Sequence, residues 1–401
     1  MNRVVSSTFV VVTMLWLAAA ARGDGGFIHL QTNALDLAQT RQEVVLVLQE
    51  LPPDPQLTRA TYVLRSRYAG TPSAFAWVIP VPSTPTDVVA HETDALFESL
   101  DAETAPSFFI VQPMGGGGCS CGAGGVASEV NGLVQVESRG TAGVFEWAAL
   151  SSNGSEALLA WLSDNGFEVG EDAAPILDNY IQQGSHFLAV KIQEPQTLGD
   201  QGEVEIPPIQ FSCQTTKWYY PMAISKISAA QETEVVIYVL ADHRMEGQNV
   251  PNALISPSAL EFDATNPSMT NYETLFLQTL ESHGGLALIT EFAGSTQNRA
   301  LWNVADWRDA PPGASDLPFL TRMRSIISRE RLDRDFDFQA AESDTEINSA
   351  FNVVASAQHA AFAIGQIFAL ALMLGAARTA FRTWGHKQRR GRSEAPGRHY
   401  A

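Results

Sequence analysis

The chain has 401 residues, of which 45% are hydrophobic, and its formal net charge at pH 7 is −19. This length exceeds what one hydrophobic core usually organises, so we expect one large domain or two closely packed domains. A strongly acidic chain repels phosphate backbones, which argues against nucleic acid as a partner. Three cysteines are too few to build a disulfide scaffold.

The first 23 residues have the pattern of a secretory signal peptide. Arg3 supplies the positive start, residues 9–17 (FVVVTMLWL) form a short apolar stretch, and residues 18–21 offer small-residue cleavage sites. The apolar stretch is too short for a comfortable membrane span, and no basic stop-transfer flank follows it. We therefore predict that residues 1–23 are a signal peptide that is removed on export.

Residues 24–330 are predicted to form one extracytoplasmic domain, with two packed subdomains as the alternative. Alternating or β-branched apolar runs indicate strands at 43–50, 60–68, 75–81, 107–111, 133–137, 144–150, 186–192, 209–213, 234–240 and 286–291. Helical patterns occur at 94–100, 155–166, 175–183, 271–282 and 317–328. Because the strands outnumber the interspersed helices, we predict an α+β fold with mixed, mainly antiparallel sheets.

The C-terminal part is predicted to anchor the protein in a membrane. Residues 331–349 are interpreted as an acidic juxtamembrane stalk. Residues 350–377 contain no charged side chain and are long enough for a transmembrane helix, because about 20 helical residues span the hydrocarbon layer. A buried helix of a soluble core is the alternative for this run.

The orientation of the expected span follows from its flank. Residues 378–401 carry seven basic side chains against one acid, Glu394, which is typical of a cytoplasmic tail. We therefore predict a single-pass membrane protein whose bulk, residues 24–349, lies in the periplasm or outside the cell.

Several segments together resemble one bacterial family. They are FAWVIPVPSTP at 75–85, ALFESLDAETAP at 95–106, ALLAWLSDNGF at 157–167, NYIQQGSHFLAVKI at 179–192 and TEFAG at 290–294, with LTRMRSIIS at 320–328 as a fainter match. In this order they are similar to the domain-of-unknown-function family numbered 2330, whose members are secreted or membrane-anchored. Members tend to begin the mature region with a cysteine before Gly-Gly-Phe, whereas Asp24 holds that place here, so lipid attachment there is excluded. The resemblance implies a class and a location, and it carries over no catalytic residue.

The glycine-rich stretch 115–125 carries the most suggestive local pattern, Cys119-Ser-Cys121. Two thiolates on a loop could bind a soft metal such as Cu(I) or Zn or form a redox pair, with Cys213 as a third ligand. The alternatives are a disulfide from one of them to Cys213, or an inert loop. We favour these, because no histidine lies near enough in the sequence to complete a ligand set. No cofactor is predicted.

Two further patterns favour structure over chemistry. Asp333, Asp335 and Asp337 have the spacing that starts a calcium loop, but Phe338 occupies the place of the required glycine, so a half-exposed strand or a solvated stalk is favoured. The histidines outside the expected span form no metal-binding spacing, and the best placed is His243, which follows a strong strand.

The sequence contains no recognisable catalytic constellation, so we predict no catalytic residue. The aromatic run KWYYP at 217–221 is interpreted either as a binding platform or as packing beneath a loop. Our leading hypothesis is a non-enzymatic, membrane-tethered outer domain that binds an envelope protein or a small ligand, or acts as a scaffold. The alternative hypothesis is an envelope enzyme, redox protein or metal-handling protein that uses Cys119 and Cys121.

Overall fold

The computed structural model describes residues 26–29, 38–69, 75–110, 135–167, 173–192, 203–261, 270–296 and 310–353. The chain divides into two compact units. Within the described residues the smaller unit comprises 107–110, 260–261, 270–272 and 350–353, and the larger unit comprises the rest.

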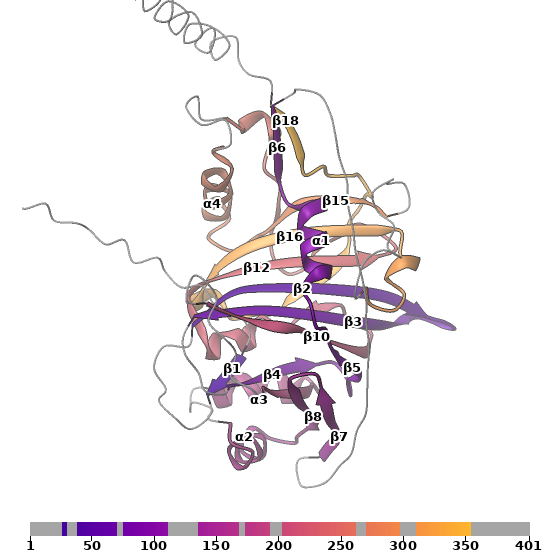
Figure 1. The fold of residues 1–401 in the computed structure, drawn as a ribbon, viewed down its shortest axis with the longest axis vertical. Coiled ribbons are helices and arrows are strands. Elements are labelled where there is room, and N and C mark those ends of the chain that lie inside the picture. The colour runs from indigo at the N-terminus through magenta and orange to yellow at the C-terminus, as the bar shows by residue number, and fades with distance from the viewer. Residues whose placement is uncertain are drawn as a thin grey trace, which may run out of the picture. The chain divides into compact units, whose positions relative to one another are not determined.

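An eight-stranded sheet forms the centre of the larger unit, in the order β14-β15-β16-β12-β2-β3-β10-β5 (Figure 1). Neighbouring strands are antiparallel except for the parallel pairs β12–β2 and β14–β15. The strands are β2 (Ala38–Leu51), β3 (Asp54–Ala69), β5 (Thr86–Ala90), β10 (Glu203–Thr215), β12 (Ala229–Ala241), β14 (Asn252–Ala253), β15 (Leu288–Ser295) and β16 (Phe319–Ser328).

The central strands of this sheet are covered on both faces. In β2, Val44 and Leu46 belong to one hydrophobic cluster, whereas Val45 and Val47 belong to another. Successive side chains of a strand point to opposite faces, so a continuous apolar run is what a strand buried on both sides requires. This explains why EVVLVL contains no polar residue after Glu43.

A five-stranded antiparallel sheet, in the order β1-β4-β9-β8-β7, packs against one face of the larger sheet. Side chains of both sheets, among them Leu46, Phe211, Trp77 and Leu188, share one buried cluster, which places the main core between the two sheets. The strands are β1 (Gly26–His29), β4 (Phe75–Val81), β7 (Gln135–Ala142), β8 (Phe145–Ser151) and β9 (His186–Ile192).

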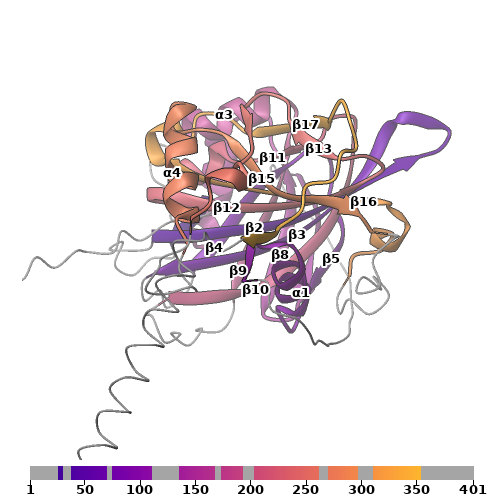
Figure 2. The same cartoon turned by 90° about the horizontal axis from the view of Figure 1, so that it is seen from above.

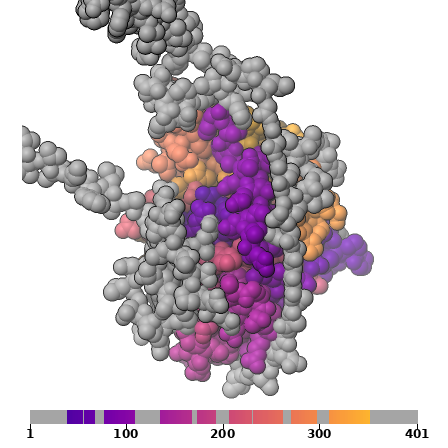
Figure 3. All heavy atoms as spheres, viewed as in Figure 1, coloured from indigo at the N-terminus to yellow at the C-terminus, as the bar shows by residue number. Residues whose placement is uncertain are grey.

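Helices cover the outer faces of the two sheets. α1 (Ala95–Thr104) packs Leu96, Phe97 and Leu100 on the eight-stranded sheet, and Figure 3 shows this purple segment at the molecular surface. α2 (Ser155–Asp164) and α3 (Ala174–Gln182) pack on the five-stranded sheet. The larger unit therefore has layers in the order helix, sheet, sheet, helices. The remaining helical segments are α4 (Tyr272–Ser282), η2 (Ala223–Ile227), η3 (Pro257–Ala259), η5 (Ala314–Asp316) and η6 (Arg329–Arg331).

A small three-stranded sheet brings together two segments that the sequence singles out. β11 (Tyr219–Tyr220) comes from the KWYYP run, β17 (Phe336–Ala340) from the acidic stretch, and β13 (Met245–Gly247) completes the order β11-β17-β13 (Figure 2). Phe336 and Phe338 of β17 are buried in the main core. This segment is therefore the half-exposed strand that the alternation of phenylalanines and acids favours, and not a solvated stalk, because the two aromatic side chains at alternate positions are buried.

The smaller unit contains a two-stranded parallel sheet of β6 (Ser107–Ile110) and β18 (Ala350–Val353). The rings of Phe108 and Phe351 stack with centroids 5.6 Å apart, and Tyr272 lies beside them. The first four residues of the expected transmembrane run are therefore a strand. The rest of that run, the expected signal peptide, the basic tail and the Cys119–Cys121 loop lie outside the described residues.

The predicted α+β class with mixed, mainly antiparallel sheets is confirmed. The helix predicted at 317–328 is wrong, because this segment is β16, a strand next to the centre of the large sheet. The sequence does not show the alternation of apolar and polar residues that usually identifies a strand. Leu320 is apolar, but Arg322 and Arg324, which lie on the same face, are charged and pair with acids of neighbouring strands. Among the described helices none is long and apolar enough to cross a membrane.

Candidate functional site

A polar cleft of about 320 Å³, which we call the Asp335 cleft, opens where α3, β10 and the three-stranded sheet meet. Five segments that are far apart in the sequence contribute to it. Its lining residues are Leu57, Pro82, Tyr180, Gln183, Gly184, Ser185, Gln214, Thr215, Thr216, Lys217, Tyr219 and Asp335.

Asp335 is the acidic side chain that lines this cleft. Its Oδ1 accepts hydrogen bonds from the Tyr180 hydroxyl and, at 3.0 Å, from the backbone N–H of Ala223. Burial raises the pKa of Asp335 to about 6, although both hydrogen bonds and the nearby Lys217 favour the charged form. The carboxyl therefore changes charge close to neutral pH while part of its side chain remains open to the cleft.

Tyr180 holds this carboxyl in place. Its hydroxyl donates to Asp335 and accepts a hydrogen bond of 3.2 Å from the backbone N–H of Ile224. Burial, followed by the charge of Asp335, raises the pKa of Tyr180 well above its ordinary value of 10.0. The hydroxyl consequently stays protonated at neutral pH and acts as a fixed donor.

A lysine, Lys217, also lines the cleft and pairs with a second carboxylate, that of Asp337 in β17. Lys217 Nζ is 2.8 Å from Asp337 Oδ1, and it lies 5.4 Å from the centre of the Tyr219 ring. The Lys217 side chain is 53% exposed, so its charge is neutralised by Asp337 but remains in contact with solvent. The KWYYP run therefore contributes Lys217 and Tyr219 to the cleft, and Asp335, the residue before β17, contributes its acid.

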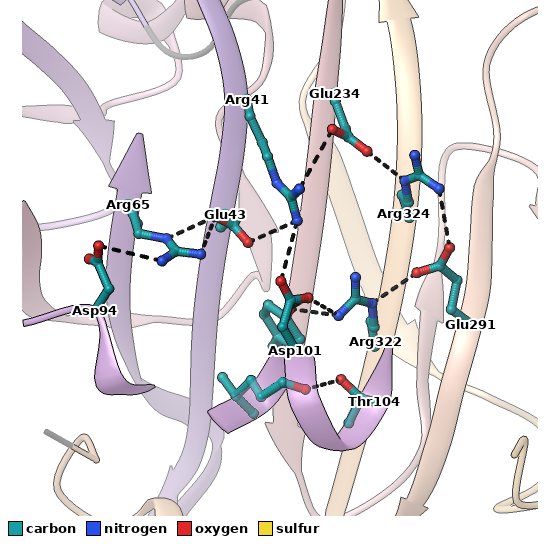
Figure 4. Close-up of polar contacts among 12 residues, drawn as sticks. Arg41, Glu43, Arg65, Asp94, Asp101, Thr104, Glu234, Glu291, Arg322 and Arg324 are labelled. Atoms are coloured by element: carbon teal, nitrogen blue, oxygen red, sulfur yellow. Dashed lines mark hydrogen bonds and ion pairs between the residues drawn. The ribbon is translucent and has the colours of Figure 1, made fainter. Parts of the chain in front are cut away.

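The outer face of the eight-stranded sheet carries a buried ion-pair network (Figure 4). Glu43 of β2 accepts from Arg65 Nε at 2.8 Å and pairs with Arg41 at 3.0 Å. Arg41 also lies 3.9 Å from Glu234 of β12, which pairs with Arg324 at 2.6 Å. The network thus runs across neighbouring strands, with opposite charges at cross-strand positions.

The same network fastens α1 to the sheet. Arg322 of β16 binds Asp101 of α1, donates to the Tyr238 hydroxyl at 2.7 Å, and pairs with Glu291 of β15 at 2.8 Å. Glu291 is fully buried, and the Arg322 side chain is only 4% exposed. Because these charges satisfy one another away from solvent, we assign the network a structural role.

The structure separates the three aspartates of the calcium-like spacing. Asp333 pairs with Arg334 at 2.8 Å, Asp335 lies in the cleft, and Asp337 pairs with Lys217. Only Asp337 belongs to β17, whereas Asp333 and Asp335 precede the strand, and the three carboxylates have different surroundings rather than one shared centre. Within the described part of the chain no group of three or more His, Cys, Asp or Glu side chains could hold a metal ion.

His243 and Cys213, which the sequence analysis considered as candidate site residues, each contact groups outside the cleft. His243 Nδ1 lies 2.9 Å from Asp344 Oδ2 at the surface, and this contact raises the pKa of His243. Cys213 is a buried free thiol on β10 whose Sγ lies 3.6 Å from the backbone oxygen of Ser83. Burial raises the pKa of Cys213 to about 12. Because Cys119 and Cys121 lie outside the described residues, the metal, redox and disulfide alternatives stay predictions.

Sequence reasoning identified Asp335 and the KWYYP run but not their association, and it missed Tyr180. No local signal marks this tyrosine, since NYIQ reads as an ordinary turn of an amphipathic helix. Only the pairing of β11 with β17 brings the two segments and α3 together.

The fold and the cleft define a layered α+β protein with a polar cleft. The model of a family described as "Uncharacterized protein conserved in bacteria (DUF2330)" matches residues 32–339. The chain belongs to this bacterial family, as the sequence resemblance indicates.

Comparison with curated proteins gives no significant match. Among solved structures, a crystal structure of baculovirus P35 aligns with 77% of this chain and 98% of its own length, at 10% identity and a TM-score of 0.33. A similarity at this level supports no inference about fold or function.

Proposed function

We propose that this protein is a membrane-tethered binding protein of the bacterial cell envelope, and that the Asp335 cleft binds a small polar ligand that carries an ammonium group. The location rests on the signal-like N-terminus, the uncharged run at 350–377 and the basic tail after it. The ligand class rests on the chemistry of the cleft.

The observation that carries the proposal is a carboxyl group that lines a cleft and whose charged form is disfavoured by burial. Burial disfavours the charged form of Asp335, and the fixed donors Tyr180 and Ala223 N–H compensate for this only in part. Carboxyl groups whose pKa is shifted by burial, when they lie in a cleft, are candidates for functional sites. A ligand cation supplies the compensation that the protein itself lacks.

The other side chains that line the cleft indicate which groups the ligand carries besides its ammonium group. Gln183, Ser185 and Gln214 offer polar side chains, whereas the one lysine is paired with Asp337. An ammonium ligand with a hydroxyl group therefore finds one charged partner and several neutral ones. The acidic charge of the whole chain also favours the approach of cations.

Calorimetric titration of the full-length protein in detergent at pH 7.5 tests this site. Ethanolamine is the probe, and ethylene glycol is the control of similar size without a charge. We expect binding of ethanolamine only, and a loss of about tenfold or more in affinity for Asp335→Asn, because a charged hydrogen-bond partner is removed. Asp316→Asn, which changes an exposed aspartate on η5, should bind as the unaltered protein does.

The pH dependence sharpens the test. Because the charged carboxylate is the binding form, affinity should rise as the pH passes upward through about 6. Equal heats for ethanolamine and ethylene glycol, or unchanged binding by Asp335→Asn, would contradict the ligand class.

The tether is tested separately from the cleft. A phosphatase reporter, which is active only after export, should be inactive when fused after Ala401 and active when fused after Glu346. Activity of the Ala401 fusion would contradict the proposed orientation. Release of the full-length protein from membranes by alkaline carbonate would contradict the tether.

A further inference from the structure

A second cleft, which we call the Trp161 cleft, lies on the face of the five-stranded sheet that carries α2. Its volume is about 500 Å³, and it shares no lining residue with the Asp335 cleft. Arg139, Glu146 and Lys191 come from three neighbouring strands, and Trp161 comes from α2. Small-molecule sites have volumes of roughly 300–1,000 Å³, so this cleft is large enough for one or two sugar-sized rings.

Small residues in the sheet create the hollow. Ala148 of β8 lies directly opposite Ala189 of β9 on one side and Arg139 of β7 on the other. Side chains at directly opposite positions of antiparallel strands share a face, so the two alanines form a low floor beneath the longer side chains around it. Glu146 and Lys191, which are also opposite one another, extend the same face towards the end of the strands.

An aromatic wall borders this floor. Leu158 and Leu162 of α2 are fully buried in the cluster beneath the helix, whereas Trp161 between them stays partly exposed and lines the cleft. The Trp161 and Phe167 ring centroids are 6.0 Å apart. An indole that faces a cleft offers a rigid apolar surface with a polar edge, which is the usual property of a binding platform.

The charged side chains that line the cleft are mainly positive, whereas the chain as a whole is negative. Lys191 Nζ lies 5.9 Å from the centre of the Phe167 ring and donates to the backbone oxygen of Asn165 at 3.2 Å, so the aromatic wall holds this cation in position. With Arg139, two cations line the cleft against the single acid Glu146, although the whole chain has a net charge of −19. A local excess of positive charge in a cleft favours an anionic ligand.

We propose that the Trp161 cleft binds an acidic sugar residue of the hexuronic acid class. The C–H face of such a ring packs on Trp161, and its carboxylate pairs with Arg139, whose planar guanidinium matches a carboxylate. Thr141, Asn165 and Glu146 provide partners for the ring hydroxyls. The proposal uses other residues and another ligand class than the Asp335 cleft, so either can fail without the other.

Calorimetric titration of the full-length protein in detergent with glucuronic acid tests the proposal. Glucose controls for the ring without the charge, and propionate controls for the charge without the ring. We expect glucuronic acid to bind about tenfold more tightly than either, and its affinity to fall as the salt concentration rises. Arg139→Gln should lose about tenfold in affinity, whereas Arg329→Gln, with the same charge change on η6, should lose none.

Trp161→Ala should abolish binding, with thermal unfolding recorded as a check on folding. If this variant does not fold, Arg139→Gln still tests the proposal. Arg139 lies on the edge strand β7 and outside the hydrophobic clusters, so its replacement should leave the fold intact. Equal affinity for propionate and glucuronic acid, equal affinity for glucose and glucuronic acid, or unchanged binding by Arg139→Gln would each overturn the proposal.

Discussion

The hydroxyl of Tyr180 donates a hydrogen bond to the carboxyl of Asp335, which lies 155 positions further along the chain. This contact joins α3 on the five-stranded sheet to the residue that precedes β17 of the three-stranded sheet. The backbone N–H of Ala223 shares the same carboxyl oxygen, so η2 is fixed to both. One acidic group therefore organises three elements and also faces a cleft.

Replacement of Asp335 by asparagine should stabilise the protein at pH 7.5. The pKa of the carboxyl is about 6 in the folded protein and 3.8 in the reference state, so above pH 6 the folded state must hold a charge that burial disfavours. The difference corresponds to roughly 3 kcal/mol, and we expect about 2 kcal/mol because the cleft admits water. Urea unfolding of the full-length protein in detergent measures this gain.

The sign of the pH dependence provides the check. Between pH 4 and pH 6 the unfolded chain loses the Asp335 proton before the folded protein does, so this group lowers stability as the pH rises. The difference between the Asn variant and the unaltered protein should therefore vanish near pH 4. A difference that is the same at pH 4 and pH 7.5 would mean that the carboxyl is not buried.

Replacement of Tyr180 by phenylalanine should act in the opposite direction. The change removes the donor to Asp335 and leaves the backbone N–H of Ile224 without its acceptor, at a cost of about 1–3 kcal/mol. Because the lost hydrogen bond favours the charged carboxyl, the pKa of Asp335 should also rise. Carboxyl carbon NMR during a pH titration measures the second effect, and an unchanged pKa would exclude the contact.

Replacement of Arg322 by methionine should destabilise the protein by roughly 3–5 kcal/mol, because it removes the nearer of two arginines that pair with the buried Glu291, the other being Arg324 at 3.6 Å. Glu291 is fully buried and pairs with Arg322 at 2.8 Å, and the helix residue Asp101 loses its main partner. Arg334→Met, which removes an exposed pair with Asp333, is the matched control and should cost less than about 1 kcal/mol. Similar losses for the two variants would show that the network is not buried.

The sequence predicts the class of this fold because its central strands have strong local patterns. EVVLVL in β2 and EVVIYVL in β12 are short, rich in β-branched residues and apolar at consecutive positions, which favours a strand covered on both faces. The helices at α2 and α4 are likewise confirmed near their predicted limits. In these elements local propensity and tertiary burial agree.

β16 could not be predicted in this way, because its character depends on partners elsewhere in the chain. Arg322 and Arg324 interrupt the apolar pattern, and they become compatible with a buried face only through Glu291 and Glu234 from neighbouring strands. The Asp335 cleft is hidden for the same reason. Its acid and its tyrosine belong to segments whose association depends on sheet order.

In the folded protein, Cys213 should be resistant to alkylation. Its thiol is buried and its pKa is raised to about 12 from an ordinary 9.0, which reduces the reactive thiolate at pH 8 about a thousandfold. In a Cys119→Ser, Cys121→Ser variant we expect no iodoacetamide adduct in the folded protein and one adduct in urea, as measured by intact mass.

The unaltered protein then decides between the cysteine alternatives. If Cys213 is the free thiol of the structure, urea alone, without reductant, should make it available for alkylation. Protection of Cys213 in urea that ends only after reduction would instead establish the disulfide to Cys119 or Cys121. A free Cys213 has a further consequence, because a buried thiol on β10 with so high a pKa is a poor metal ligand. A metal site on the Cys119–Cys121 loop would then have to form without Cys213.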